Sequence, residues 1–269
     1  MPLTESVWEP VSVRERVKSV LYRVYERRLL NQLDRSALPH HIGVIHDGHR
    51  RYAKQAGLPD YAASYQVGMD KVREFFGWVE ELEIPAVTCW LLSQENLQRP
   101  AEELEPYYDV LIDLFASLPG ALHGATSVKF VGSLDLLPER LVSAAKDLES
   151  ECPTGHRRIT IALGYGGRQE IVDATKDLIR SLADQGLDGH SIADRVDADQ
   201  LAKHMYISDV PDPDLVIRTS GESRLSGFLL WQAAYAEFSF VDVYWPAFRR
   251  VDFLRSMRDF TGRSRRFGK

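Results

Sequence analysis

The stretch HDGHRRYAKQAG, residues 46 to 57, places one acid, two glycines, two histidines and three cations directly after the apolar run HIGVI. Arginine presents a rigid fork of donors to phosphate oxygens, and backbone N–H groups at a helix start add further donors. A carboxylate beside bound phosphates repels them unless a cation lies between, which makes Asp47 a candidate Mg²⁺ ligand and Glu237 a candidate second one. The stretch therefore predicts an anion site served by a metal ion.

Comparable polar clusters follow three further apolar runs. They are Ser93-Gln94-Glu95-Asn96 with Arg99, Gly164-Tyr165-Gly166-Gly167-Arg168, and Arg218-Thr219-Ser220-Gly221 with Arg224 and Ser226. Taken singly, each cluster could be a turn or a helix cap. In an open parallel sheet, ligands bind beyond the carboxyl ends of the strands, so these clusters are expected to converge. Their residue types predict a site for a phosphate-bearing ligand, although the chain has no GxxxxGK[ST] and its glycine-rich turn is not a GxGxxG.

The apolar residues between these clusters could wall a tunnel. The second run ends in Trp90-Leu91-Leu92, and the helical stretch after Arg99 carries Tyr107, Tyr108, Val110, Leu111, Leu114 and Phe115. An anion site at one end of such a tunnel suits a ligand with a charged head and an apolar tail. Ordinary hydrophobic core is the alternative, and it is the more usual role for such residues.

Short β-rich runs alternate with helical stretches along the whole chain. We expect strands at 41–45, 86–93, 127–132, 158–166, 214–220 and 238–243, and helices at 62–82, 101–117, 138–150, 168–186, 197–205 and 251–263. This alternation predicts an α/β fold, a single domain with a central six-stranded, mostly parallel sheet flanked by helices. The stretch 206–214, with two prolines and three aspartates, reads as a functional loop rather than a domain border.

Composition limits the possible classes of function. With 269 residues and 44% hydrophobic content the chain can bury one large core, and its net charge of −6 argues against a nucleic-acid binder that relies on a positive field. Two cysteines are too few for a disulfide framework, which fits a reducing cytosol. No apolar run approaches the roughly 20 residues that span a bilayer. The sequence predicts a soluble, cytoplasmic protein.

An amphipathic helical segment is expected over residues 1–38, followed by the main domain at 39–269. Valines and leucines recur at helical spacing from residue 17 to residue 30, with six arginines and lysines interleaved between 14 and 28. Such a stripe usually packs on its own domain. The alternative is peripheral contact with an anionic membrane.

Five stretches resemble the cis-prenyltransferases, the undecaprenyl diphosphate synthase group, in order and spacing from about residue 40 to the end. They are HIGVIHDGHRRYA, LLSQENLQRP, GYGGRQEIVDA, DPDLVIRTSGESRLSGFLLWQAAYAEF and RRFG. The resemblance implies a homodimer and the Mg²⁺-dependent condensation of an allylic diphosphate with isopentenyl diphosphate. The DDxxD motif of the all-helical trans-prenyltransferases is missing.

The resemblance also implies roles for individual residues. The turn from Asp47 to Arg51 would hold the allylic diphosphate, Arg218, Arg224 and Ser226 the second diphosphate, and Arg266 and Gly268 of the terminal motif would reach the neighbouring subunit's site. The candidate catalytic residues are Asp47, His49, Ser93 and Asn96. The candidate metal ligands are Asp47 and Glu237. The candidate substrate-binding residues are Gly48, Arg50, Arg51, Tyr52, Tyr65, Leu91, Glu95, Arg99, Arg218, Arg224, Ser226, Arg266 and Gly268.

Departures from the family pattern carry information. His49 stands where the family usually has Asn, Tyr52 where it has Trp, and Tyr65 where long-chain members have His. His49 could be a hydrogen-bonding substitute for Asn or a new acid or base, and the proton acceptor stays open. Leu91 stands two residues before Ser93, where long-chain members have a small residue that leaves their tunnel open. We therefore expect a product of about two or three isoprene units, as in actinobacterial (Z)-farnesyl diphosphate synthases.

Two other functions compete with this short-chain, head-to-tail condensation. The altered turn at His46 and His49 raises the possibility of irregular head-to-middle coupling to a lavandulyl-type diphosphate, which would proceed from dimethylallyl diphosphate alone. A non-catalytic partner subunit is a third possibility, although such partners typically lose the acid and arginine ligands that this chain keeps at Asp47, Arg218 and Arg224.

Overall fold

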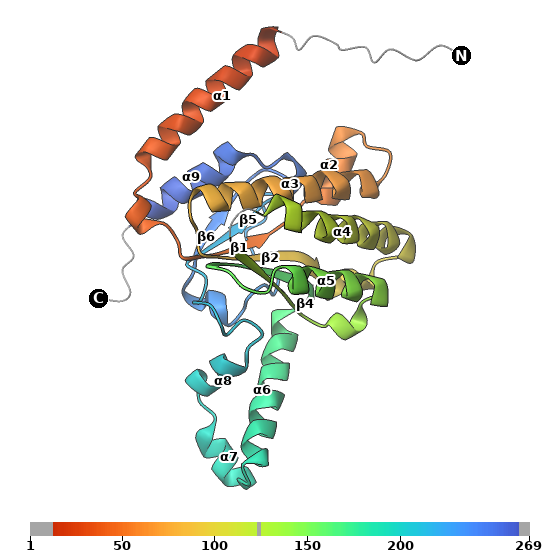
Figure 1. Cartoon of the computed structure of the whole chain (residues 1–269), viewed down its shortest axis with the longest axis vertical. Coiled ribbons are helices and arrows are strands. Elements are labelled where there is room, and N and C mark those ends of the chain that lie inside the picture. Colours follow the sequence, from red (N-terminus) through yellow and green to blue (C-terminus); the bar gives the residue numbers. More distant parts are fainter. Residues whose placement is uncertain (1–12, 123–124, 264–269) are drawn as a thin grey trace.

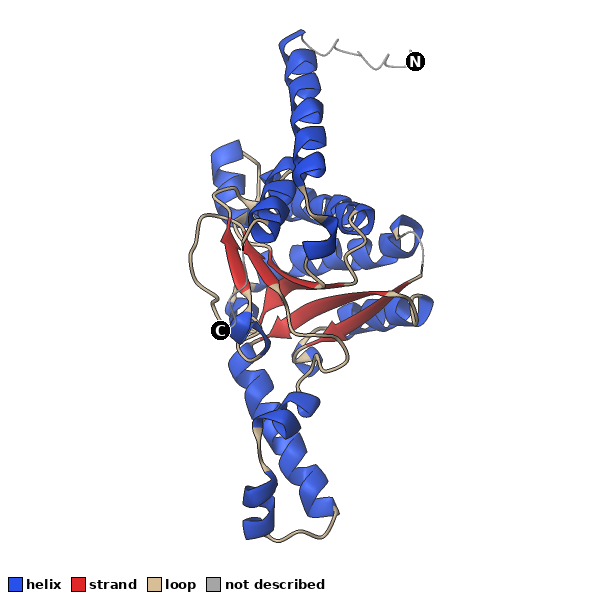
Figure 2. Ribbon diagram, turned by 90° about the vertical axis from the view of Figure 1, so that its left-hand side faces the viewer, coloured by secondary structure: helices blue, strands red, loops and turns tan. Residues whose placement is uncertain are grey.

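Six parallel strands form the centre of the molecule (Figure 2). The computed structural model describes residues 13–122 and 125–263. The strands are β1 (His41–Ile45), β2 (Ala86–Ser93), β3 (Thr126–Val131), β4 (Arg157–Tyr165), β5 (Leu215–Arg218) and β6 (Glu237–Phe240). Each neighbouring pair of these strands is parallel. The expected α/β fold is confirmed, and the sheet in the described residues is parallel throughout.

The strand order β3-β4-β2-β1-β5-β6 places β1 between β2 and β5. The chain leaves β1 toward one side of the sheet and returns at β5 on the other side. Such a reversal opens a crevice at the carboxyl ends of the strands, where α/β proteins bind ligands. The ends of β1, β2 and β5, with the polar clusters that follow them, therefore lie together.

Helices cover one face of the sheet (Figure 1). They are α2 (His49–Ala56), α3 (Tyr61–Glu81), α4 (Ala101–Ala121), α5 (Glu139–Glu151) and α9 (Arg250–Thr261). The apolar sides of α3, α4, α5 and α9 form the larger core with residues of the strands, Phe75 and Leu111 among them, whereas α2 packs against α3. A smaller core on the other face gathers Trp90, Tyr165 and Phe228, and it is covered largely by the segment 205–236 rather than by long helices. Strands β1 to β5 are thus buried on both faces, as their continuous apolar runs require, whereas the edge strand β6 is only partly buried.

A helical arm projects from the body below the sheet (Figure 1). It consists of α6 (Gly167–Asp184), α7 (Gly189–Arg195) and α8 (Ala198–His204). Glu170, in the first turn of α6, is fully buried and accepts hydrogen bonds from Tyr206 N (2.9 Å) and Gln232 Nε2 (2.8 Å). These contacts fasten the base of the arm to the segment that covers the second core.

Helix α1 (Val13–Gln32) packs on the domain with one side only. Leu29 is fully buried, Arg250 pairs with Glu26 at 2.9 Å, and Arg249 donates to the Tyr22 hydroxyl at 2.6 Å. Leu21 and Val24 are 64% and 63% exposed, so this part of the apolar stripe does not pack on the domain. No helix in the described part of the chain is long and apolar enough to cross a bilayer.

Candidate active site

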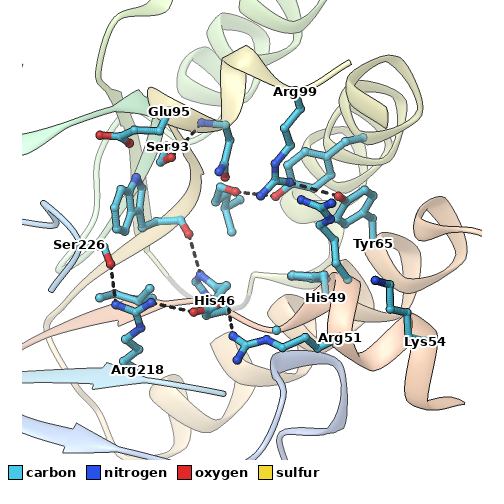
Figure 3. A pocket seen from close by; sticks show the side chains of 18 residues that line it. His46, His49, Arg51, Lys54, Tyr65, Ser93, Glu95, Arg99, Arg218 and Ser226 are labelled. Atoms are coloured by element: carbon cyan, nitrogen blue, oxygen red, sulfur yellow. Dashed lines mark hydrogen bonds and ion pairs between the residues drawn. The ribbon is translucent and has the colours of Figure 1, made fainter. Parts of the chain in front are cut away.

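A cavity of about 620 Å³ lies at the carboxyl ends of β1, β2 and β5, and it brings together most of the residues singled out in the sequence (Figure 3). Of those residues, the following line it: Asp47, Gly48, His49, Arg50, Arg51, Tyr65, Leu91, Ser93, Glu95, Asn96, Arg99, Arg218 and Ser226. The convergence expected from a parallel sheet is therefore present in the structure.

Gly48 turns the chain from β1 into α2. Its φ of 109° lies in the region that only glycine adopts readily, and a Cβ there would lie 2.6 Å from Cδ1 of Tyr244. The turn is held from behind, because Trp245 N donates to the Asp47 carbonyl at 2.9 Å. Gly48, His49 and Arg50 at the start of α2 line the cavity, so an anion there can accept from N–H groups of the first helical turn.

The Asp47 carboxylate lies between two arginines. It accepts hydrogen bonds from Arg218 Nη2 at 2.8 Å and from Arg51 Nη2 at 3.2 Å. Burial by itself raises the pKa of Asp47. The hydrogen bond and charge of Arg218, the hydrogen bond of Ser220 and the charge of Arg51 together outweigh burial and hold the pKa below its usual range. Asp47 is therefore ionised at neutral pH and has oxygens directed at the cavity.

Arg218 is the deepest cation of the site, only 4% exposed. Besides Asp47, its guanidinium donates to Ser226 Oγ at 2.8 Å and to the Arg224 carbonyl. The Arg224 side chain itself is 61% exposed and pairs with Glu222, so it does not line the cavity. A role for Arg224 in phosphate binding requires that its side chain turn inward.

Arg51 is held by the same loop that carries Glu222. It donates to Ser220 Oγ at 2.8 Å and pairs with Glu222 at 2.9 Å. Its guanidinium also lies over the Tyr244 ring, 5.5 Å from the centroid. The turn after β1 and the loop after β5 are thus joined through one side chain.

A second cationic cluster, formed by Arg99 just before α4 and Arg50 on α2, lies across the cavity. Arg99 donates to the Tyr65 hydroxyl at 3.2 Å (Figure 3). Arg99 also donates to Glu103 on α4 at 3.1 Å, and the Tyr65 hydroxyl donates to Glu103 at 2.7 Å. Arg50 lies 3.8 Å from Glu103. Glu103 was not assigned from the sequence; it lies in the first turn of α4, four residues after Arg99, which precedes the helix.

Lys54 lines the cavity one turn after Arg50 and Arg51 on α2, and it was not assigned from the sequence. Among the described residues it has no carboxylate partner, unlike Arg51, Arg99 and Arg218. Its charge is therefore available to an incoming anion.

We expect Lys54→Gln to weaken the binding of inorganic diphosphate by about three- to tenfold at low salt, and by less at high salt because exposed charges are screened. Calorimetric titration at two salt concentrations measures the effect. Lys203→Gln, on the projecting arm, is the control. An unchanged affinity in the Lys54 variant would show that this cation does not contact the anion.

His46 and His49 are buried and neutral. Each Nδ1 lies 3.3 Å from a carbonyl oxygen, that of Trp90 for His46 and that of Ser64 for His49. A carbonyl only accepts, so Nδ1 carries the proton in both rings and each Nε2 is an acceptor. Burial lowers the pKa of His46 to about 3 and that of His49 to about 4. Within the described residues neither Nε2 has a hydrogen-bond partner.

The depressed pKa of His49 predicts a loss of stability in acid. Between its ordinary pKa of 6.5 and the folded value of about 4, the unfolded chain binds more protons than the folded one. The free energy of unfolding should therefore fall as pH drops through this range, by at most about 1.4 kcal/mol per pH unit for one histidine. His49→Asn should make the fall shallower, as urea unfolding at pH 4.5, 5.5 and 7 would show. An identical slope in the variant would contradict the buried, neutral state.

Three of the described residues that the sequence assigned to the site lie away from the cavity: Arg224, as noted above, Tyr52 and Glu237. Tyr52 lines a separate cavity of about 520 Å³ with Tyr244. Glu237 pairs in register with Leu215 at the start of β5, whereas Arg218 pairs with Phe240 at its end. Glu237 is thus at the opposite edge of the sheet, where it pairs with Arg263 at 3.0 Å. Arg266 and Gly268 lie outside the described residues.

The donors of the cavity fit magnesium only in part. No group of three or more metal-ligating side chains occurs in the part of the chain that the structure describes. Asp47 offers one ionised carboxylate beside a phosphate-binding surface. Mg²⁺ is commonly held by one or two carboxylates plus substrate phosphates, so Asp47 fits that mode and not an all-protein cage.

Comparisons with known proteins agree with this geometry. The family model described as undecaprenyl diphosphate synthase matches residues 45–268. Isoprenyl transferase 1 of Corynebacterium efficiens is 48% identical over 93% of this chain and 98% of its own length. The (2Z,6E)-farnesyl diphosphate synthase of Mycolicibacterium smegmatis is 45% identical over 94% of this chain and 98% of its own. A crystal structure of lavandulyl diphosphate synthase from Lavandula x intermedia, in complex with dimethylallyl diphosphate, has a TM-score of 0.81 at 29% identity and covers 87% of this chain and 100% of that one.

Proposed function

Because the chain belongs to the undecaprenyl diphosphate synthase family of cis-prenyltransferases, we propose that it makes a short prenyl diphosphate. The substrates are an allylic diphosphate, dimethylallyl or geranyl, and isopentenyl diphosphate, and the product has about ten to fifteen carbons. Diphosphate is released. The observation that carries the proposal is the cation-rich rim around Asp47 and Arg218, which lies above a pocket walled by Leu91 and Tyr107.

The rim can bind two diphosphates side by side. Arg51, Lys54 and the first N–H groups of α2 face the allylic diphosphate, while Arg218 and Ser226 face that of isopentenyl diphosphate. Asp47 would hold Mg²⁺, which would supply positive charge to the departing diphosphate. The arginines and N–H groups are fixed in place before the reaction, so they stabilise charge as it develops on the leaving oxygens.

The apolar part of the cavity receives the prenyl chain. Trp90, Leu91 and Tyr107 line it, and they shield the allylic cation from water once the carbon–oxygen bond breaks. The isopentenyl double bond then attacks the cation, and a base, either the departing diphosphate or a polar side chain of the cavity, takes a proton from the new carbon skeleton. Ser93 and Asn96, at the end of β2, lie near the reacting carbons in this arrangement.

Leu91 supports a short product. It is 6% exposed and lies in the cavity wall two residues before Ser93. The Mycolicibacterium smegmatis relative carries the name of a farnesyl diphosphate synthase, a fifteen-carbon product, which agrees with a restricted pocket.

The proposal extends to assembly and location. The catalytic domain would span 39–269, and two copies would form a homodimer. Within one chain Glu237 lies at the opposite ends of the strands from Asp47, so the two residues could share a metal ion only if Glu237 came from a second copy. Leu21 and Val24 on α1 are free for peripheral contact with a membrane from the cytoplasm. Sedimentation of the purified protein with and without anionic vesicles tests both statements.

Irregular coupling of two dimethylallyl units is the second candidate. Two buried histidines flank Asp47, and the lavandulyl diphosphate synthase structure shares the fold. The purified protein with Mg²⁺ should form product from dimethylallyl or geranyl diphosphate only when isopentenyl diphosphate is added. Product from dimethylallyl diphosphate alone would favour irregular coupling. No product from any combination would favour a non-catalytic partner subunit.

A further inference from the structure

The apolar end of the cavity is built around an irregularity in β2. Trp90 pairs with Ala162 of β4 and Leu92 with the next residue, Leu163, so Leu91 is an extra residue in this strand. Bulges of this kind re-aim a side chain and leave the extra residue outside the regular pairing. The position of Leu91 in the cavity wall therefore depends on something other than the ladder between β2 and β4.

Tyr107 supplies the missing contact. Its hydroxyl donates to the Leu91 carbonyl at 2.5 Å, from α4 to β2. Tyr107 is 4% exposed, so this hydrogen bond also satisfies a polar group that burial has removed from water. The bond fixes both the bulged backbone and the tyrosine ring.

A second tyrosine supports the first. The Tyr65 ring from α3 lies 4.3 Å from that of Tyr107, centroid to centroid, at 38°. The Tyr65 hydroxyl accepts from Arg99 (Figure 3) and donates to Glu103, so the ring cannot turn aside without breaking two polar contacts. The pair connects the phosphate-binding rim to the apolar end of the cavity.

The helical turns beyond Tyr107 leave little room for a longer chain. Leu111, Leu114 and Phe115 follow on α4, and Phe115 packs edge-on against Phe130 of β3 at 4.8 Å. None of these side chains is more than 6% exposed. A prenyl chain that passed the tyrosine pair would have to displace a closely packed core.

We propose that Tyr107 determines product length, because its hydroxyl pins the bulged Leu91 and its ring, backed by Tyr65, closes the cavity to further isoprene units. This inference rests on the proposed function and adds to it a second residue, on a different element, that limits the chain. Leu91 narrows the passage, and Tyr107 fixes where Leu91 lies.

The test compares three variants with the unaltered protein. Tyr107→Ala removes ring and hydroxyl, and Tyr107→Phe removes the hydroxyl alone. Tyr108→Ala is the matched control, since Tyr108 is the next residue on α4 and equally buried but does not line the cavity. Products from geranyl and isopentenyl diphosphates are separated by mass.

We expect Tyr107→Ala to make products at least one isoprene unit longer as the main species. Tyr107→Phe should keep the original product as the main species and should raise the yield of the product that is one isoprene unit longer several-fold. Tyr108→Ala should match the unaltered protein. An unchanged length in Tyr107→Ala, or the same lengthening in Tyr108→Ala, would overturn the inference. Equal products from Tyr107→Phe and the unaltered protein would refute the pinning of Leu91.

A binding measurement separates this inference from the proposed function. The dissociation constant for geranylgeranyl diphosphate divided by that for geranyl diphosphate should fall at least tenfold in Tyr107→Ala. Calorimetry without turnover measures both constants. A lower ratio in a protein that makes no product would support the closure of the cavity by Tyr107 and contradict the proposed activity. An unchanged ratio in a folded, active variant would contradict the closure and leave the activity standing.

Discussion

Replacing Asp47 by Asn should lower kcat/KM for condensation by about 10³-fold. The amide keeps the shape of the carboxylate but neither holds a cation nor carries the charge that orders Arg218 and Arg51. Steady-state kinetics at saturating Mg²⁺ measure the loss. The free energy of unfolding should fall by only about 1–3 kcal/mol, because Arg218 keeps Ser226 and the Arg224 carbonyl as acceptors.

Glu95→Gln is the matched control for Asp47. Glu95 also lines the cavity, and among the described residues it has no ion pair. Its variant should stay within about tenfold of the original kcat/KM, since Glu95 is exposed at the rim and its charge is screened by solvent. Full activity in Asp47→Asn, or equal losses in the two variants, would remove Asp47 from the reaction.

Arg218→Lys should raise KM for isopentenyl diphosphate by about 100-fold. The guanidinium serves Asp47, Ser226 and the Arg224 carbonyl at once, and an ammonium group on a flexible stem cannot satisfy the three acceptors and a phosphate together. Kinetics with isopentenyl diphosphate varied at fixed geranyl diphosphate measure the change.

Arg168→Lys provides the comparison for Arg218. Arg168 is exposed at the same edge of the sheet, at the start of α6, and does not line the cavity. The KM of Arg168→Lys for isopentenyl diphosphate should equal that of the unaltered protein. Should Arg218→Lys keep the original KM, the second diphosphate does not bind at this guanidinium.

Five of the six strands were predictable from the sequence because they are buried on both faces, whereas the edge strand β6 is only partly buried. Such strands appear as continuous apolar runs, and all six expected runs are strands in the structure. The two strands at one edge, β5 and β6, are shorter than the runs that indicated them, since the chain leaves the ladder for the loops at 219 and 241.

Helix α2 was missed for a physical reason. Its residues are mostly polar and its start depends on the left-handed backbone at Gly48, which sequence periodicity does not reveal. The same helix explains Tyr52. Consecutive helical residues point about 100° apart, so Tyr52 lies about 200° around the helix from Arg50 and points away from the cavity that Arg50 lines. The helix also carries Lys54 to the rim, where spacing from Arg50 and Arg51 could have indicated it.

Glu237 shows the limit of reading motifs along a chain. The stretch 212–238, which ends next to Glu237, also contains the rim residues Arg218 and Ser226. The end of the sheet at which each residue lies depends, however, on strand register. The register puts Glu237 three residue pairs from the edge that Arg218 occupies. Its predicted role as a metal ligand stays a prediction, one that depends on a second copy of the chain.

The proposed condensation requires that two diphosphates bind at the same time to the rim above the apolar pocket. Isopentenyl diphosphate should be titrated calorimetrically into protein saturated with Mg²⁺ and an unreactive thio analogue of geranyl diphosphate. We predict one further binding site per chain in the presence of the analogue, and its loss in Arg218→Lys. If saturation with the analogue abolishes isopentenyl diphosphate binding, the cavity holds a single diphosphate and the proposed condensation is wrong.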